Sequence, residues 1–466
     1  MSDSTTTRFR HQIFRLHQQK EADLDFGLGE ILPPEEVAAI LEEEGATWKS
    51  IVDTPLLTTW AFLWQVLNPD RSCRAAVKRI AVWLGSQGKK LANDKDDPYI
   101  KARQRLPETV PIRLMKRIGR RCHERAEDNW RWCGRTVKVV DGSTVSMPDT
   151  AANQAAYPQS RSQAPGLGFP LARLVVVFCL ATGVVLESAI GPARGKKTGE
   201  NTLFRSLWDC LEPGDVILAD RCYCSYFDIA MLRGRGVDVV FRLHQQRGSD
   251  FRCGRRLGHE DQIVSWTRPP RPAWMDEATY EQIPEILEVR QIRVRVETRG
   301  FRTRVLELVT TLLDAEIYTK AKIAVLYRQR WHAELDLRSI KVVLGMDVLR
   351  CKTPEMVRKE IGMTLTGYNV VRALMVQAAK EHRREPRQLS FKGALQSLLG
   401  FAEKLRESSA KKRDWLWEII LEGVANDEVG NRPDRVEPRA RKRRPKPYPL
   451  LMRPRKEARN ALLKAA

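Results

Sequence analysis

The stretch RTVKVVDG, residues 135–142, is rich in β-branched residues and ends on an aspartate followed by a glycine. Three short runs of the same kind follow it along the chain: LARLVVVFCL, GVVLESAI and GDVILADR. Such runs, bounded by Gly, Pro or Asp, are typical of β-strands. The segment ENTLFRSLWDCL between the last two favours a helix, so this part of the chain predicts an α/β layer with mixed strand pairing.

Outside this layer the pattern changes twice. Towards the N-terminus, segments such as PEEVAAILEEEG and IRLMKRIGRRCHERA are helical and polar, without a strong strand signal. After the layer, the runs QIRVRVE and TRVLELVTTLL alternate like a hairpin that turns at Arg299 and Gly300. The sequence therefore predicts five parts: an N-terminal helical domain (1–128), the first part of the core (129–235), a β-rich insertion (236–318), the second part of the core with C-terminal helices (319–430) and a basic tail (431–466).

The composition is that of a basic globular protein. At 466 residues and 42% hydrophobic, the chain is long enough to bury a sizeable core. Lys and Arg number 80 against 58 Asp and Glu, which gives a net charge of +22. A partner made of phosphates is expected for such a charge, although an ordinary basic protein has the same composition. The segment 439–459 alone carries ten Lys or Arg against one Glu, and we interpret it as an arm for phosphates or a partner protein.

Three other classes of protein are disfavoured. The nine cysteines form no CxxC pair, so a thiolate zinc site is not indicated, and we interpret them as reduced thiols of a cytoplasmic protein. The first residues contain no apolar run of the kind found in secretion signals. The longest apolar run, residues 174–186, has 13 residues, which is too short to span a bilayer and fits two strands with a turn at Ala181 to Gly183.

Two aspartates are candidates for chemistry because of where they stand. Asp141 closes the predicted strand TVKVVD beside a glycine turn, and Asp220 closes GDVILAD. Strands that end on carboxylates are a common way to hold metal ligands on rigid elements. Aspartate also ends strands as a turn former, so neither residue decides the question alone.

A third carboxylate lies in YRQRWHAELDLRSIK, residues 327–341. On an ideal helix of 3.6 residues per turn, its polar residues form one narrow stripe that includes Glu334. Apolar residues flank the stripe on both sides, while Asp336 falls opposite Glu334 and is expected to face solvent. The stripe either presents Glu334 from a packed face or is a set of helical ion pairs. Its members are Tyr327, Arg330, Glu334, Arg338 and Lys341, flanked by Trp331 and Leu335 on one side and by Leu326 and Leu337 on the other.

Three carboxylates suit a hard divalent cation, Mg²⁺ or Mn²⁺. Two such ions roughly 3.5–4 Å apart can activate a water or a 3′-hydroxyl and stabilise the leaving oxygen of a phosphodiester. Arg330 and Lys341 would then serve the phosphate oxygens. The three acids Asp141, Asp220 and Glu334 therefore predict two-metal phosphoryl transfer on a polyanion.

With these residues in place, the sequence resembles the DDE transposases of the insertion-sequence-four group. The spacing Tyr, two residues, Arg, three residues, Glu, six residues, Lys is the signature of that family, and Tyr327 to Lys341 fit it without a gap. VVDGST at 139–144 is similar to the family's first aspartate motif. GDVILADRCY at 214–223 is similar to the second, with Asp220 and Arg221 as its Asp-Arg pair.

The resemblance implies a ribonuclease H-like catalytic core with a β-rich insertion, as well as an enzyme that cuts DNA at transposon ends in the presence of Mg²⁺. Strand transfer by the freed 3′-hydroxyl is implied too, in a cut-and-paste reaction through a hairpin intermediate. The implied partners are double-stranded DNA and a second copy of the chain in a synaptic complex. Tyr327, Arg330 and Lys341 would contact the DNA backbone, and Arg242 matches an arginine that members often carry.

The sequence departs from the family in its insertion and, mildly, in the first motif, which reads Gly-Ser-Thr where Gly-Thr is commoner. It also leaves two other functions open. Members can stack an insertion-domain tryptophan on a flipped base, but the strand TRVLELVTTLL has none, and Trp266 and Trp274 are expected in a Pro-rich loop. A metal-dependent nuclease of the same fold and a catalytically silent protein that binds transposon ends are the alternatives. The N-terminal helices are either the end-recognition surface, with KRIGRRCHER as one candidate, or a packing domain.

Overall fold

The computed structural model describes residues 27–48, 54–86, 88–91, 93–195, 198–296, 305–430 and 449–465. The chain forms two compact units. The first comprises Met1–Arg125, Ser339–Met346 and Glu355–Val429, and the second comprises Ala126–Arg338, Asp347–Pro354 and Gly430–Ala466. Among the helices of the described residues, none has the length and apolar character needed to cross a membrane.

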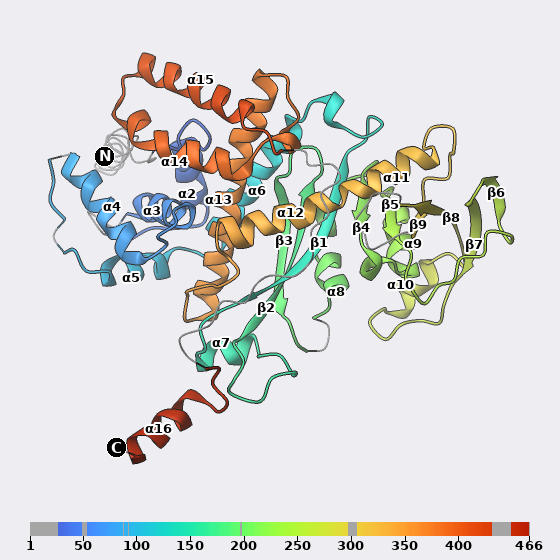
Figure 1. Ribbon diagram of the computed structural model, residues 1–466, viewed down its shortest axis with the longest axis horizontal. Helices are drawn as coiled ribbons and strands as arrows, with labels where there is room; N and C mark the ends of the chain where they lie inside the picture. The colour runs from blue at the N-terminus through green and yellow to red at the C-terminus, as the bar shows by residue number, and fades with distance from the viewer. Residues whose placement is uncertain are drawn as a thin grey trace, which may run out of the picture. The chain divides into compact units, whose positions relative to one another are not determined.

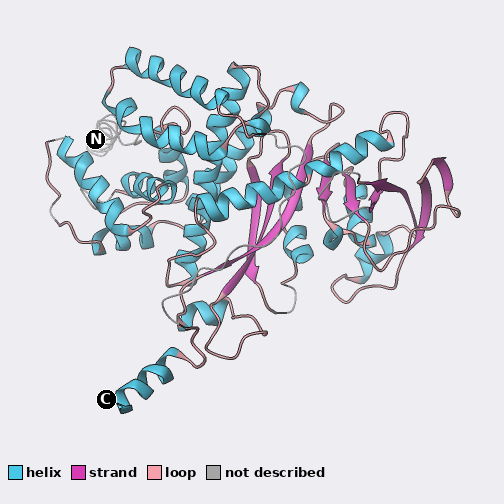
Figure 2. Ribbon diagram, viewed as in Figure 1, coloured by secondary structure: helices cyan, strands magenta, loops and turns pink. Residues whose placement is uncertain are grey.

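The first unit is helical in its described part (Figure 2). Its longest helix, α13 (Pro354–Glu381), is buried along most of its length and packs with its glycines against other helices. The Cα of Gly367, for example, lies so close to Leu67 that an added Cβ would stand 3.1 Å from that side chain. The other α-helices among the described residues of this unit are α2 (Pro34–Glu43), α3 (Pro55–Leu67), α4 (Cys73–Ser86), α5 (Asp97–Arg105), α6 (Thr109–Glu124), α14 (Phe391–Glu407) and α15 (Ala410–Asn426).

The second unit is built on a nine-stranded sheet in the order β3-β2-β1-β4-β5-β9-β8-β7-β6 (Figures 1 and 2). β2 is antiparallel to β1 and β3, whereas β4 is parallel to both β1 and β5, which is the mixed pairing predicted from the sequence. The strands are β1 (Val137–Ser146), β2 (Leu171–Cys179), β3 (Val185–Pro192), β4 (Val216–Ala219), β5 (Asp238–Arg242), β6 (Arg255–Gly258), β7 (Asp261–Thr267), β8 (Ile286–Arg295) and β9 (Val305–Thr310).

Strand β1 does not end at Asp141, contrary to the prediction. It continues to Ser146, because β2 runs alongside it and pairs Asp141 with Val176 and Gly142 with Val175. Gly142 therefore lies within the strand and forms no turn; its missing side chain leaves space that Glu200 occupies. The carboxyl carbon of Glu200 lies 2.6 Å from where a Cβ on Gly142 would stand, so the absence of a side chain at Gly142 lets the Glu200 carboxylate lie in this position.

The insertion prolongs the sheet beyond β5. β9 pairs antiparallel with β5, and β8, β7 and β6 follow outward in turn. The predicted hairpin of β8 and β9 is confirmed, although its turn at Arg299 and Gly300 lies outside the described residues. Trp266, expected in a loop, is buried in β7 instead, where the Arg247 guanidinium lies 4.1 Å from its ring centroid.

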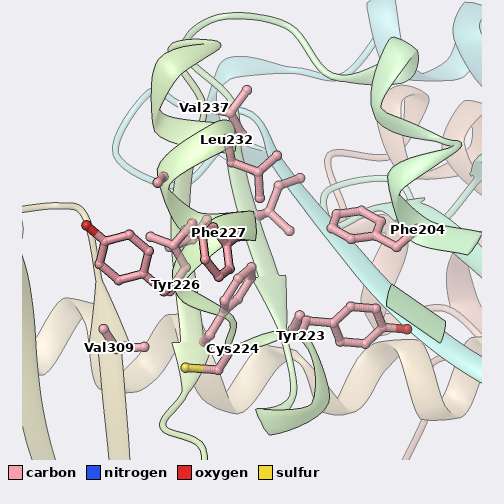
Figure 3. Packing of buried hydrophobic residues seen from close by; sticks show 14 of the residues in the cluster. Phe204, Tyr223, Cys224, Tyr226, Phe227, Leu232, Val237 and Val309 are labelled. Carbon is pink, nitrogen blue, oxygen red and sulfur yellow. The ribbon is translucent and has the colours of Figure 1, made fainter. Parts of the chain in front are cut away.

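Helices cover both faces of the sheet in the second unit. On one face, α8 (Glu200–Arg205) and α9 (Tyr226–Gly234) pack on alternate residues of β1, β4 and β5, and together they form the hydrophobic cluster of Figure 3. On the other face, α11 (Lys320–Gln329) and α12 (Trp331–Arg338) cross in front of the strands (Figure 1). Three further helices of this unit are α7 (Ala151–Ala156), α10 (Glu277–Gln282) and α16 (Arg455–Ala465).

The segment predicted as one helix at 327–341 is interrupted. α11 ends at Gln329, Arg330 forms a tight turn, α12 follows, and Ser339–Val343 is a π-helix. Asp336 is fully buried, so the expectation that it faces solvent was wrong. The exposed side of α12 instead carries Trp331 and Leu335, at 46% and 39% exposure, because the helix is enclosed on the side of Asp336 and Leu337.

Candidate active site

Strand register places three of the predicted site residues in one row. Val139 of β1 lies beside Leu218 of β4, and Leu218 lies beside Val240 of β5. Two residues further along these parallel strands come Asp141, Asp220 and Arg242. Because side chains alternate along a strand, all three point to the face that α11 and α12 cover.

The helix pair adds the remaining acid to this row. α12 packs against β1 and α11 packs against β5. Arg330, between the two helices, therefore lies above the row of Asp141, Asp220 and Arg242. Its guanidinium lies 2.6 Å from the Glu334 carboxylate and 3.8 Å from Asp141 Oδ2. One arginine therefore lies between two of the three predicted acids.

Asp220 is held by the turn that follows β4. The strand ends at Ala219, and one carboxylate oxygen of Asp220 accepts a hydrogen bond of 2.7 Å from the Cys222 amide. The residue thus caps a short 3₁₀ turn, Arg221–Tyr223, with part of its carboxylate. The sequence prediction that Asp220 closes a strand is confirmed.

Burial dominates the electrostatics of Asp141. Loss of solvent raises the pKa of this carboxyl to about 6, and the negative charges of Asp220 and Glu334 add to the shift. The positive charge of Arg330 and the hydrogen bond from the Gly142 amide, 2.9 Å long, act in the opposite direction. A buried carboxyl with acidic neighbours is typical of a cation-binding site.

Arg242 and Arg221 add positive charge to the site, and the phenol of Tyr327 lies beside them. Burial raises the pKa of the Tyr327 phenol to about 12, even though Arg330 and Arg242 favour its ionised form. Burial lowers the pKa of Arg242, and the nearby positive charges of Arg221 and Arg330 lower it further. The strand register, the Arg330 ion pairs and these charge effects together bring seven predicted residues into one place: Asp141, Asp220, Arg221, Arg242, Tyr327, Arg330 and Glu334.

Lys341 is the one predicted residue that lies in the other unit. It stands in the π-helical segment Ser339–Val343 and is partly buried. The spacing of Lys341 from Glu334 matches the signature, but its contact with DNA stays a prediction.

Sequence reasoning missed a fourth carboxylate near the acids. Glu200, the first residue of α8, lies over Gly142 on the opposite face of β1 from Asp141 and 3.8 Å from the Arg173 guanidinium. Its charge, followed by those of Asp141 and Asp220, adds to the effect of burial in raising the pKa of Tyr223. The only signal in the sequence was the glycine after Asp141, which we interpreted as a turn former.

The donor chemistry of the three acids fits a hard divalent cation. Carboxylate oxygens are the ligands that Mg²⁺ and Mn²⁺ prefer, and all three acids come from rigid elements. Within the described residues, however, no three His, Cys, Asp or Glu side chains stand close enough to share one ion. The guanidinium of Arg330 lies between Asp141 and Glu334 in this arrangement.

Comparison with known proteins agrees with this geometry. The family model described as "Transposase DDE domain" matches residues 132–370, which is about half of the chain and includes all of the predicted site residues. The chain is 26% identical over 433 residues to the transposase InsG for insertion sequence element IS4 of Escherichia coli, covering 91% of this chain and 93% of that protein.

Among solved structures, a cryo-EM structure of the piggyBac transposase synaptic complex with hairpin DNA covers 90% of this chain and 87% of its own, at 11% identity and a TM-score of 0.40. The family match confirms the predicted ribonuclease H-like α/β core. The helices α2 to α6 confirm the predicted N-terminal helical region in its described part. The extent of that match shows that this chain belongs to the DDE transposases.

Proposed function

We propose that this transposase cuts DNA at the ends of its own element and transfers the freed strands to a target, in a cut-and-paste reaction. The observation that carries the proposal is the convergence of Asp141, Asp220 and Glu334 from two adjacent strands and a helix. The acids would hold two Mg²⁺ ions, for which Mn²⁺ can substitute. Bound there, such ions lower the barrier to in-line displacement at a phosphodiester.

The protein's own side chains supply the rest of the chemistry. Asp141, with its pKa near 6, has to be ionised to serve as a ligand, and it is largely ionised at neutral pH. Arg330, Arg242 and Arg221 would bind the non-bridging oxygens of the scissile region, since Arg suits two-point contacts with phosphate. Tyr327 would hold the backbone beside the terminal nucleotide.

Double-stranded DNA is the proposed substrate, as terminal repeats and as target. Helix α6 supports this, since Lys116, Arg117 and Arg120 line its exposed side while Leu114 and Ile118 are buried. A basic helix face of this kind can enter a major groove, and we propose it as the end-recognition surface of the region 1–128. A homodimer in the synaptic complex is part of the same proposal.

The first test is cleavage of a labelled duplex that carries the element's terminal repeat. Nicking at the repeat boundary is expected with Mg²⁺ and not with EDTA, because the acids act only through bound cations. Joined products with an added target duplex separate the transposase from a simple nuclease. Tight, specific binding without any cut would instead support a protein that only occupies the ends.

Lys341→Ala is expected to weaken duplex binding at low salt by about tenfold and to lower the slope of log Kd against log salt by about 1, as for loss of one phosphate contact. Filter binding from low to high salt measures both values. Lys411→Ala, an exposed lysine on α15, is the control for general charge loss. An unchanged slope in Lys341→Ala would give this lysine a structural role.

A further inference from the structure

Arg330 occupies a position that connects the two halves of the site. It is the residue between α11 and α12, with φ of −52° and ψ of −31°, so its side chain can reach Glu334 one helical turn ahead. The same guanidinium also lies 3.8 Å from the carboxylate of Asp141 on β1. A single flexible side chain thus contacts acids from two separate elements.

These contacts differ from ordinary ion pairs on a helix surface. The side chains of Arg330 and Asp141 are only 17% and 16% exposed, and that of Glu334 is 37% exposed. Exposed pairs four residues apart contribute little, but charges withdrawn from water need a counter-charge. Without Arg330, no positive charge would lie between Asp141 and Glu334. The two carboxylates would then repel each other and Asp220.

The same position conflicts with a shared metal ion. A cation that bound Asp141 and Glu334 together would need the oxygen atoms that now face the guanidinium. As the side chains stand, no three acids within the described ranges come within reach of one ion. A guanidinium and a metal ion are therefore alternative counter-charges for the same carboxylates.

We propose that Arg330 is exchanged between the carboxylates and DNA. Before DNA binds, it holds Glu334 and Asp141 in place as a counter-ion. When a DNA phosphate arrives, the guanidinium moves to the phosphate oxygens and leaves both carboxylates to the divalent cation. Arg330 is thus a positioning residue in the free protein and a phosphate ligand in the complex.

The exchange couples two binding events. DNA binding raises the affinity for metal because it removes the competing guanidinium, and by thermodynamic reciprocity metal raises the affinity for DNA to the same extent. A metal ion is then held tightly only where a phosphodiester is present to be cut. This inference rests on the metal-dependent function proposed above and adds its regulation.

The test measures Mn²⁺ binding to the full-length protein. Binding is monitored as the loss of the electron paramagnetic resonance signal of free Mn²⁺. The duplex ends at the repeat boundary and carries a 2′,3′-dideoxy terminus, so neither cleavage nor transfer can occur. We expect this duplex to tighten Mn²⁺ binding to the wild type by about tenfold, within the usual range of such couplings. Arg330→Gln is expected to bind Mn²⁺ tightly without DNA and to respond to the duplex less than about threefold.

Arg328→Gln is the matched control. Arg328 lies on the same helical segment, two residues earlier, and its side chain is exposed. This variant should keep the wild-type coupling, which separates the contacts of Arg330 from a general loss of positive charge. Circular dichroism of both variants checks that the helices are intact.

The outcomes distinguish this inference from the function on which it rests. Mn²⁺ binding to the wild type that is equally tight with and without duplex would overturn the exchange and leave the metal chemistry standing. Weaker Mn²⁺ binding in Arg330→Gln would also overturn it. A wild type that binds no Mn²⁺ even with duplex present would refute the proposed function itself.

Discussion

Asp220→Asn is expected to lose cleavage of a terminal-repeat duplex by about a thousandfold or more, equivalent to ~4 kcal/mol in the barrier. The reason is that a neutral amide replaces one of the three carboxylates proposed to hold the metal ions, in the row that also contains Asp141 and Arg242. The side-chain oxygen of asparagine can still accept the hydrogen bond from the Cys222 amide, so the turn after β4 should be preserved.

The measurement is the rate of nicking with saturating Mg²⁺, accompanied by fluorescence anisotropy of the labelled duplex in the absence of divalent metal. Binding should change by less than about threefold, because the phosphate contacts come from other residues. Asp209→Asn is the matched control, since Asp209 is fully exposed in a short turn of the same unit. Cleavage by Asp220→Asn within tenfold of the wild type would remove Asp220 from the metal site.

Arg290→Ala is expected to destabilise the second unit by about 3–5 kcal/mol. Arg290 is fully buried in β8, and its guanidinium donates to both carboxylate oxygens of Asp261, at 2.7 and 2.5 Å. A third hydrogen bond of 2.7 Å reaches the Tyr318 carbonyl. Removal of the arginine leaves the Asp261 carboxylate buried without its counter-charge.

Urea unfolding monitored by tryptophan fluorescence gives the free energies. Arg295→Ala, on the same strand but with a side chain 73% exposed, should change stability by less than about 0.5 kcal/mol. The double variant Arg290→Met with Asp261→Val should recover part of the loss, because an apolar pair needs no counter-charge. If Arg290→Ala is as stable as Arg295→Ala, then the buried pair makes no net contribution.

Local patterns in the sequence predicted most strands, because β-branched runs and glycine turns act over a few residues. The hairpin of β2 and β3 is an example, with Gly183 at a φ of +80° in its turn. The length of β1 could not be predicted in this way. It depends on how far β2 runs alongside, which no property of Asp141 and Gly142 themselves reveals.

The site residues were predictable as types and spacings, but their arrangement was not. The adjacency of Asp141, Asp220 and Arg242 follows from the register of three strands that are distant in sequence. The helical wheel placed Arg330 and Glu334 on one side correctly, and the pair is present. The same wheel failed for Asp336, because burial depends on neighbouring elements that a single helix does not specify.

The continuous hydrogen bonding from β5 through β9 makes the insertion unsuitable for simple excision. A shortened chain joined after β5 would leave that strand as an unpaired edge of the sheet. Its exposed backbone N–H and C=O groups could then pair with other chains and cause aggregation. It would also lose the Lys320 ammonium contact with the His259 carbonyl, 2.7 Å long, which anchors the start of α11. Engineers seeking a smaller enzyme of this kind would have to supply a replacement edge strand before removing any part of β6 to β9.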